Sequence, residues 1–202
     1  LDPVVARNPD TVRRFEREGR AAASLDHPNV VPVYEAGEAG GLVFIAMRLV
    51  EGQTLEELID EQGPVSPEEA GRLLAPVAEA LDLAHARDLV HRDVKPSNIL
   101  IEGDRVWLAD FGIAASLREM GSYTTGALGT AEYMAPEQAS AGDVDHRADL
   151  YGLGCVAHCL MEGAPPYAGD DLVATLMAHV NEPVPATGDV TRDEFYARAL
   201  AK

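Results

Sequence analysis

Residues 91–98 read HRDVKPSN, and the interpretation of the whole chain starts from this run. An acid, two cations and an amide stand together there, directly after a segment with helical periodicity. The simplest interpretation is a solvated, charged turn. However, Asp93 carries a carboxylate that can accept a hydroxyl proton, and Asn98 carries an amide oxygen of the kind that Mg²⁺ binds. The pattern therefore also predicts a catalytic or metal-binding site.

A second acid lies at the end of a strand-like run. Residues 105–112 read RVWLADFG, so Asp110 is expected at a sheet edge, and Gly112 can adopt backbone angles that other residues avoid. Each of these patterns is weak evidence by itself. Together, Asp93, Asn98 and Asp110 present the oxygen ligands that a magnesium ion prefers.

A third pattern, GTAEYMAPE at residues 129–137, completes the set. It follows a loop rich in Gly, Ser and Thr, residues 115–130, which is too long to be a simple connection. In this order and with these separations, HRDVKPSN, DFG and APE resemble the catalytic loop, the magnesium loop and the activation-segment end of eukaryotic-type protein kinases. VKPSN and GTAEYMAPE resemble the Ser/Thr rather than the Tyr kinases. The sequence as a whole resembles bacterial members of this family.

The resemblance implies roles in phosphoryl transfer for residues of the first two motifs. It makes Asp93 the catalytic base and Lys95 the group that stabilises the transferred phosphoryl. Asn98 is expected to act with them and, together with Asp110, to bind the metal. The implied cofactors are ATP and Mg²⁺, with Mn²⁺ as an alternative.

The resemblance also implies an ATP-binding set. Glu18, in the opening helix, is expected to pair with a strand lysine that grips the α- and β-phosphates, although Arg14, one turn earlier, is a local alternative partner. Met47 falls at the gatekeeper position, where an ordinary core methionine would also fit. The other members of the set are two hinge residues, whose backbone groups are expected to meet the adenine, and one residue of the strand after the catalytic loop: Leu49, Val50 and Leu100.

The loop between DFG and APE contains the expected regulatory sites. Thr124 and Thr125 are expected to be phosphorylated, and Arg92 is placed by the resemblance to bind their phosphates bidentately. The alternative is that these threonines are ordinary loop residues, because such loops favour small polar side chains.

Three further residues are expected to hold the site in place. Thr130 is expected to contact Asp93 and Lys95. Asp149 lies at the start of an almost wholly apolar helix and is expected to anchor the catalytic-loop backbone, since buried carboxylates are rare unless they are paired. Glu137 is expected to pair with an arginine that lies beyond Lys202.

Local signals predict an α+β fold, which the resemblance makes bilobal and protein-kinase-like. Capping boxes are expected at 54–57 and 66–69. The resemblance assigns residues 1–50 to an incomplete N-terminal lobe and residues 51–202 to a mainly helical C-terminal lobe. Helices are expected at 8–25, 54–63, 66–90, 146–163, 170–182 and 191–202, and strands at 30–37, 42–47, 98–104 and 105–112.

Composition and charge argue against several classes of function. The formal net charge of −18 at pH 7 opposes nucleic-acid binding, which relies on Lys and Arg. No apolar run approaches the ~18 residues of a membrane span, and no signal-peptide pattern opens the chain. A cytoplasmic location is therefore expected, unless a longer protein carries an anchor. Cys155 and Cys159 are expected in the core, because their spacing fits one helix face.

Two parts of the family pattern do not occur in the sequence. No G-x-G-x-x-G loop and no V-A-I-K lysine precede Asp10, and Lys95 is the first lysine. We therefore expect a kinase fragment truncated at both ends, with negligible phosphate transfer of its own. The complete kinase is expected to phosphorylate Ser and Thr of protein substrates and to form dimers for trans-phosphorylation. The alternative is a pseudokinase-like protein-binding module, which the intact Asp93, Asn98 and Asp110 disfavour.

Overall fold

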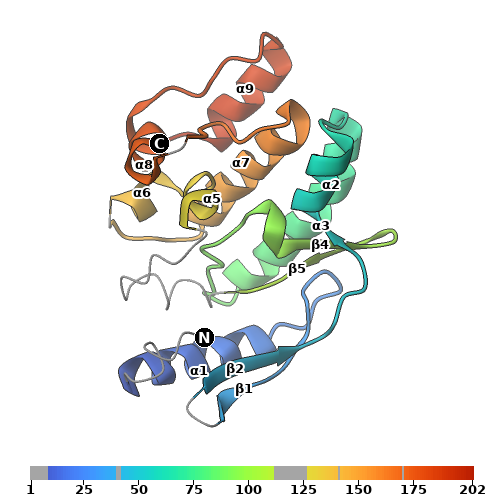
Figure 1. Cartoon of the computed structure of the whole chain (residues 1–202), viewed down its shortest axis with the longest axis vertical. Helices are drawn as coiled ribbons and strands as arrows, with labels where there is room; N and C mark the ends of the chain where they lie inside the picture. The colour runs from blue at the N-terminus through green and yellow to red at the C-terminus, as the bar shows by residue number, and fades with distance from the viewer. Residues whose placement is uncertain (1–8, 40–41, 112–126, 141, 170) are drawn as a thin grey trace.

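The structure, a computed structural model, describes residues 9–39, 42–111, 127–140, 142–169 and 171–202. Helices and antiparallel sheets lie in separate groups, which is the expected α+β class. Figure 1 shows α1, β1 and β2 together at one end and the helix-rich remainder at the other. The elements in chain order are α1 (Pro9–Ala23), β1 (Val33–Ala39), β2 (Leu42–Met47), β3 (Gln53–Thr54), α2 (Leu55–Gln62), α3 (Pro67–His85), η2 (Pro96–Asn98), β4 (Ile99–Glu102), β5 (Arg105–Leu108), α5 (Ala127–Ala131), α6 (Pro136–Ala139), α7 (Arg147–Glu162), α8 (Leu172–Asn181) and α9 (Val190–Ala199).

The small region, residues 9–50, is a helix packed on a two-stranded sheet. β1 and β2 pair antiparallel, with Gly37 opposite Phe44, which confirms the two strands predicted at 30–37 and 42–47. α1 packs against β1. A Cβ at Gly19 would lie 2.5 Å from the Cβ of Ala36, so a glycine is needed for the helix to approach the strand this closely.

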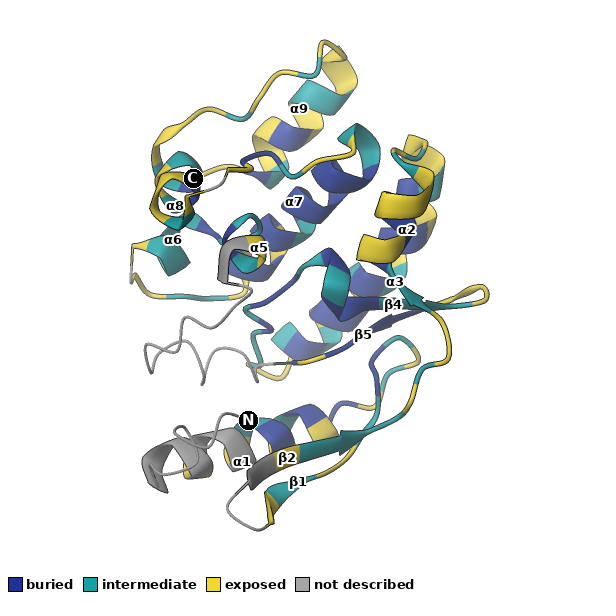
Figure 2. Cartoon of the chain, in the orientation of Figure 1, coloured by how far each residue is buried: buried dark blue, intermediate teal, exposed yellow. Residues whose placement is uncertain are grey.

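The large region, residues 51–202, is built around α3 and α7. Leu73, Val77 and Leu81 on the inner face of α3 are fully or almost fully buried. Figure 2 shows that α7 is buried along most of its length, as its nearly all-apolar sequence predicts. Side chains of α2, α3, α7 and the sheet β3-β4-β5 share one hydrophobic core. Cys155 and Cys159 are both buried, as expected.

The two regions are joined along the edge of β5. The backbone amide of Val31 donates to the carbonyl of Leu108 at 2.9 Å, and the amide of Leu108 donates to the carbonyl of Asn29 at 2.7 Å. The side-chain amide of Asn29 also donates to the carbonyl of Val106 at 2.8 Å. The segment after α1 therefore extends the sheet of the large region by a short parallel pairing, Val30 opposite Leu108.

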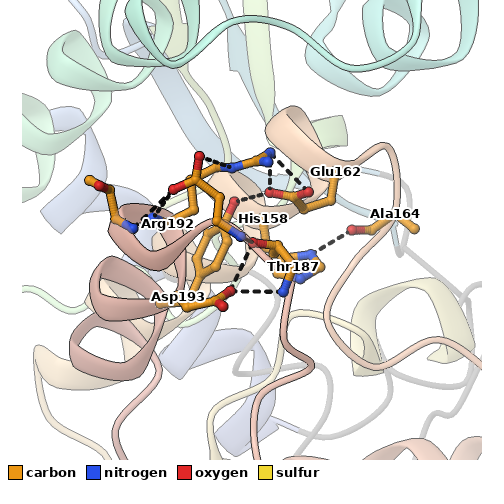
Figure 3. A network of polar contacts seen from close by, with 9 residues as sticks. His158, Glu162, Ala164, Thr187, Arg192 and Asp193 are labelled. Carbon is orange, nitrogen blue, oxygen red and sulfur yellow. Dashed lines mark hydrogen bonds and ion pairs between the residues drawn. The ribbon is translucent and has the colours of Figure 1, made fainter.

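Polar contacts fasten α9 to the end of α7 (Figure 3). Glu162 accepts hydrogen bonds from Nη1 of Arg192 at 2.9 and 3.1 Å and from the hydroxyl of Tyr196 at 2.9 Å. The carboxylate of Asp193 accepts from the backbone amide and the hydroxyl of Thr187, both at 2.8 Å. The Glu162 carboxylate, in the last turn of α7, is thus bound by two residues of α9, Arg192 and Tyr196.

The capping predictions have different outcomes. The box formed by Thr54 and Glu57 is confirmed, with the Thr54 hydroxyl accepting from the Glu57 amide and the Glu57 carboxylate accepting from the Thr54 amide. The second box is only half present. Ser66 accepts from the amide of Glu69 at 3.2 Å, but the carboxylate of Glu69 turns to the guanidinium of Arg72, because a charged donor one turn away competes with a backbone amide.

The other differences concern short elements and the ends of helices. β3, η2, α5 and α6 were not predicted, since runs of two to five residues carry no measurable periodicity. The longer helices and the paired strands are confirmed. Among the described helices, none is both long and apolar enough to cross a membrane.

Candidate active site

Asp149, in the first turn of α7, organises the backbone at the start of the loop 91–98. It is 1% exposed. Its Oδ2 accepts from the amide of His91 at 2.8 Å, and its Oδ1 accepts from the amide of Arg92 at 2.6 Å. Nε2 of His85, at the end of α3, lies 2.7 Å from Oδ2 and must carry the proton, because a carboxylate only accepts. Three donors therefore converge on one buried carboxylate.

A glycine in α7 also allows the loop 91–98 to pack closely against this helix. A Cβ at Gly152, on the same helix as Asp149, would lie 3.1 Å from the carbonyl oxygen of Val94 and 3.4 Å from that of Tyr133. The helix backbone can therefore approach both the catalytic-loop motif and the GTAEYMAPE segment closely. The apolar helix that the sequence predicts as a core element is also the scaffold of the site.

Four polar side chains meet beyond this anchor. Nζ of Lys95 lies 3.1 Å from Oδ2 of Asp93 and donates to the hydroxyl of Thr130 at 2.9 Å. The side-chain amide of Asn98 donates to the backbone carbonyl of Asp93 at 2.8 Å and to its Oδ2 at 3.1 Å. Asp93 is 8% exposed. An acid, a lysine, an amide and a hydroxyl are thus brought together from the loop and from α5.

His91 links this loop to the chain after β5. Its Nδ1 accepts from the amide of Asp93 at 3.2 Å, so its Nε2 carries the proton and donates to the carbonyl of Ala109 at 2.8 Å. The ring packs edge-on against Phe111 with 4.6 Å between centroids. Because Asp110 lies between Ala109 and Phe111, the contacts of His91 fix the backbone on both sides of it. The sequence alone indicates no separate role for His91, although this residue is the first of the run 91–98.

The backbone is strained at two points of the site. Arg92 and Asp110 have φ angles of 65° and 63°, in the left-handed region that residues other than glycine rarely adopt. The pKa of Asp110 is raised, first by desolvation of its carboxyl and then by the charge of Asp93, while His91 and Lys95 act in the opposite direction.

Asn98 and Asp110 are chemically suited to a magnesium ion. The amide nitrogen of Asn98 donates to Asp93, which leaves its Oδ1 as an oxygen donor, and the backbone carbonyl of Asn98 accepts from the amide of Ala109, the residue before the exposed Asp110. In the part of the chain that the structure describes, no group of three His, Cys, Asp or Glu side chains could enclose a metal. This donor set fits an ion that is held by one or two protein oxygens and completes its shell with phosphate and water, as Mg²⁺ does.

Three of the residues expected to bind ATP share one apolar cluster. Met47, Val50 and Leu100 pack against the buried side chains of Val31, Trp107 and Ala109. This cluster lies where the small region is joined to β5. Leu49, by contrast, is 79% exposed and does not belong to this cluster.

The remaining expected site residues are less fully described. Glu18 lies half-buried on α1, beside the close contact of Gly19 with β1. Glu137 lies half-buried in the first turn of α6. Thr124 and Thr125 lie outside the described residues.

Known proteins resemble this chain over nearly its whole length. Residues 4–195 match the family described as the protein kinase domain. The chain is 42% identical to Serine/threonine-protein kinase PknB of Mycolicibacterium smegmatis over 212 residues, and 40% identical to PknH of Mycobacterium bovis over 209. Each match covers 98% of this chain but 34% of the relative, so the chain spans about a third of these curated relatives' length.

A solved structure shows the same fold. The crystal structure of the Mycobacterium tuberculosis PknI kinase domain, determined for a mutant form, superposes with a TM-score of 0.74 at 35% sequence identity. The match covers 100% of this chain and 74% of that one. The protein-kinase-like fold expected from the three motifs is thereby confirmed.

Proposed function

Because the chain belongs to the protein kinase domain family, we propose that its protein transfers the γ-phosphate of ATP to Ser and Thr side chains of protein substrates. One observation carries the proposal. Asp93, Lys95 and Asn98, on a loop whose backbone is held by a buried carboxylate, meet Thr130 of α5 within hydrogen-bonding distance. Phosphoryl transfer depends mainly on positioning and charge stabilisation, and this arrangement supplies both.

Asp93 is the proposed catalytic base. Its Oδ2 contacts Lys95 and Asn98, so the carboxylate is oriented, and it can accept a substrate hydroxyl proton. Lys95 supplies a positive charge beside the base, where it stabilises the negative charge that develops on the transferred phosphoryl. Thr130 holds the ammonium group of Lys95 and thereby ties the substrate-facing segment to the base.

The proposed cofactors are ATP and Mg²⁺, with Mn²⁺ as an alternative. A bound divalent ion would neutralise phosphate charge, and Asn98 and Asp110 are the residues that would hold it. The apolar cluster with Met47, Val50 and Leu100 is the proposed adenine site, together with backbone groups at Leu49 and Val50. Glu18 is proposed to pair with a lysine that binds the phosphates.

We propose a regulatory set around the same loop. Phosphates on Thr124 and Thr125 would bind Arg92, which directly precedes the base. Asp149 is proposed to act as the anchor of the loop and Glu137 as the anchor of the activation-segment end. We also propose that residues 1–50 and 51–202 act as two lobes of one catalytic unit.

The wider setting of the protein is part of the proposal. We propose protein substrates, dimers that phosphorylate in trans, and a cytoplasmic position for this catalytic unit. The net charge of −18 argues against nucleic acid as a partner.

The test is phosphate transfer by the protein at its natural length. The unsubstituted protein should phosphorylate a Ser/Thr protein substrate with Mg²⁺ and ATP, and Asp93→Asn should slow turnover about a hundredfold or more, the usual contribution of a general base. Asp88→Asn is the matched control, because Asp88 is exposed and its φ of 57° is one that Asn tolerates. Equal activity of the Asp93 and Asp88 variants would contradict the assignment.

A further inference from the structure

Both backbone polar groups of Arg92 are held by side chains. Its amide donates to Oδ1 of Asp149 at 2.6 Å, and its carbonyl accepts from Nε2 of Gln138 at 3.0 Å. These side chains come from α7 and α6. The residue between the two contacts has a φ of 65° and directly precedes Asp93.

Gln138 also holds the segment from which it projects. Its Oε1 accepts from the backbone amide of Ala135 at 3.0 Å, while its Nε2 donates to Arg92. Because an amide only donates and a carbonyl only accepts, these two partners fix which way the Gln138 side chain points. One side chain therefore connects the APE segment to a residue that lies 46 positions away.

The strain at Arg92 makes this connection important. A left-handed conformation is unfavourable for a residue with a Cβ and persists only where the surroundings determine it. Asp149 determines the orientation of the peptide before Arg92, and Gln138 determines that of the peptide after it. The second peptide is the one that carries the amide of Asp93, so its orientation sets the direction in which the base leaves the loop.

We propose that Gln138 is a positioning residue that couples the end of the activation segment to the orientation of Asp93. This inference rests on the proposed function only where it predicts an effect on turnover. The contact itself can be tested without activity. The proposal adds a residue that acts through Arg92 and does not touch the reacting groups.

The decisive variant is Gln138→Glu. It keeps the oxygen that accepts from Ala135, but at neutral pH it places a carboxylate oxygen against the carbonyl of Arg92. The kcat of the protein at its natural length should fall about tenfold, the effect of losing a hydrogen bond and gaining a repulsion, with the KM for ATP within about twofold of the unsubstituted value. Hydrogen–deuterium exchange at Arg92 and Asp93 should become faster by a similar factor.

A pH profile separates positioning from general destabilisation. A protonated glutamic acid can donate to the Arg92 carbonyl, and the repulsion that costs about tenfold in kcat also raises the pKa of the introduced carboxyl by about one unit from its ordinary value of about 4.3. The kcat of Gln138→Glu relative to the unsubstituted protein should therefore recover in part as the pH is lowered from about 8 to about 5. Gln138→Met removes both hydrogen bonds without adding charge. It should lose kcat to a similar extent, with no recovery at low pH. Ser140→Ala, at an exposed residue that bonds only within α6, should change neither measurement.

The outcomes are distinct. Unchanged exchange at Arg92 in both Gln138 variants, faster exchange with unchanged kcat, or a loss of kcat in Gln138→Glu that does not vary with pH would each overturn the proposal. If Gln138→Glu does not fold, Gln138→Met decides through its kcat and exchange. If the unsubstituted protein transfers no phosphate, the proposed function fails, and exchange at Arg92 alone decides the coupling.

Discussion

Buried polar side chains divide unequally between the small region and the large region. In the described chain they all belong to the large region: His91, Asp93, Asn98, Asp149, His158, Thr175 and His179. The described buried residues of the small region are glycine or apolar: Gly19, Ala22, Leu25, Val30 and Val31. The small region also leaves Tyr34 and Phe44 exposed by 69% and 36%.

The difference shows how each region contributes to the site. Hydrogen bonds are directional, so the buried network of the large region fixes the orientation of individual groups such as the carboxylate of Asp93. Apolar packing has little directionality, so the small region is positioned mainly by shape and by its pairing with β5. The large region should therefore hold the residues of the candidate site rigidly, while the small region should open and exchange more readily.

The largest effect should follow from Asp149→Asn. The substitution places an amide nitrogen where one carboxylate oxygen accepted hydrogen bonds, so at least one donor among His85, His91 and Arg92 loses its partner in the core. The free energy of unfolding, measured by urea denaturation, should fall by about 3 kcal/mol or more. Asp145→Asn, at a solvent-accessible carboxylate paired with Arg147, is the control and should change far less. Equal effects would contradict the contrast between buried and exposed acids.

The next effect depends on pH. Burial lowers the pKa of His179 from 6.5 to about 4 in the folded chain. Between these values the unfolded chain binds more protons at this site, so stability falls as the pH is lowered from 6.5 toward 4. On going from pH 7 to pH 4.5, the unsubstituted chain should lose about 2 kcal/mol more than His179→Gln. Parallel unfolding curves for the two proteins over this range would refute the expectation.

A smaller effect is expected in the small region from Gly19→Ala. The added methyl group would lie 2.5 Å from the Cβ of Ala36, so α1 must move away from β1, at a cost of about 1–2 kcal/mol. Hydrogen exchange should become faster in β1 and remain unchanged in α7. The control is Gly71→Ala in α3, where a Cβ meets no atom within 4 Å and the change should stabilise the helix by about 0.5–1 kcal/mol. Faster exchange in both regions would show that they open as one unit.

The smallest effect should come from the junction. Asn29→Ala removes the donor to the carbonyl of Val106 and should cost about 1 kcal/mol. Exchange of the Val31 amide, which donates to Leu108, should become faster. Asn181→Ala is the control, since Asn181 is exposed and bonds only to Met177 in its own helix. If exchange at Val31 does not change, packing rather than the Asn29 side chain holds the junction.

The sequence predicted elements whose signals are local. Thr54 and Glu57 form the expected box because both partners lie in one turn, and α7 is buried because nearly every face of it is apolar. The same local logic is wrong at Glu69, where Arg72 competes for the carboxylate. The motifs also predicted residues that do meet, such as Lys95 and Thr130.

Local sequence patterns could not predict the contacts between residues that lie far apart in the chain. Gln138 and His85 have no pattern that distinguishes them from other polar residues on short or amphipathic helices. Their partners, Arg92 and Asp149, become visible only when α6, α3 and α7 are packed. The orientation of the Asn98 amide likewise depends on the folded path of the loop and not on its composition.

The convergence of three donors on Asp149 also has a consequence for the newly made chain. Asp149 lies 57 positions after Arg92, 58 after His91 and 64 after His85. At a synthesis rate of about 5–20 residues per second, roughly 3–11 s separate the making of Arg92 from the making of the carboxylate that holds it. During that interval none of the three hydrogen bonds to Asp149 described above can form. The conformation of the short loop 91–98 therefore depends on a contact with a residue far along the chain. The contacts that hold the native turn of this loop can therefore form only after α7 has been synthesised, although the loop looks local in sequence.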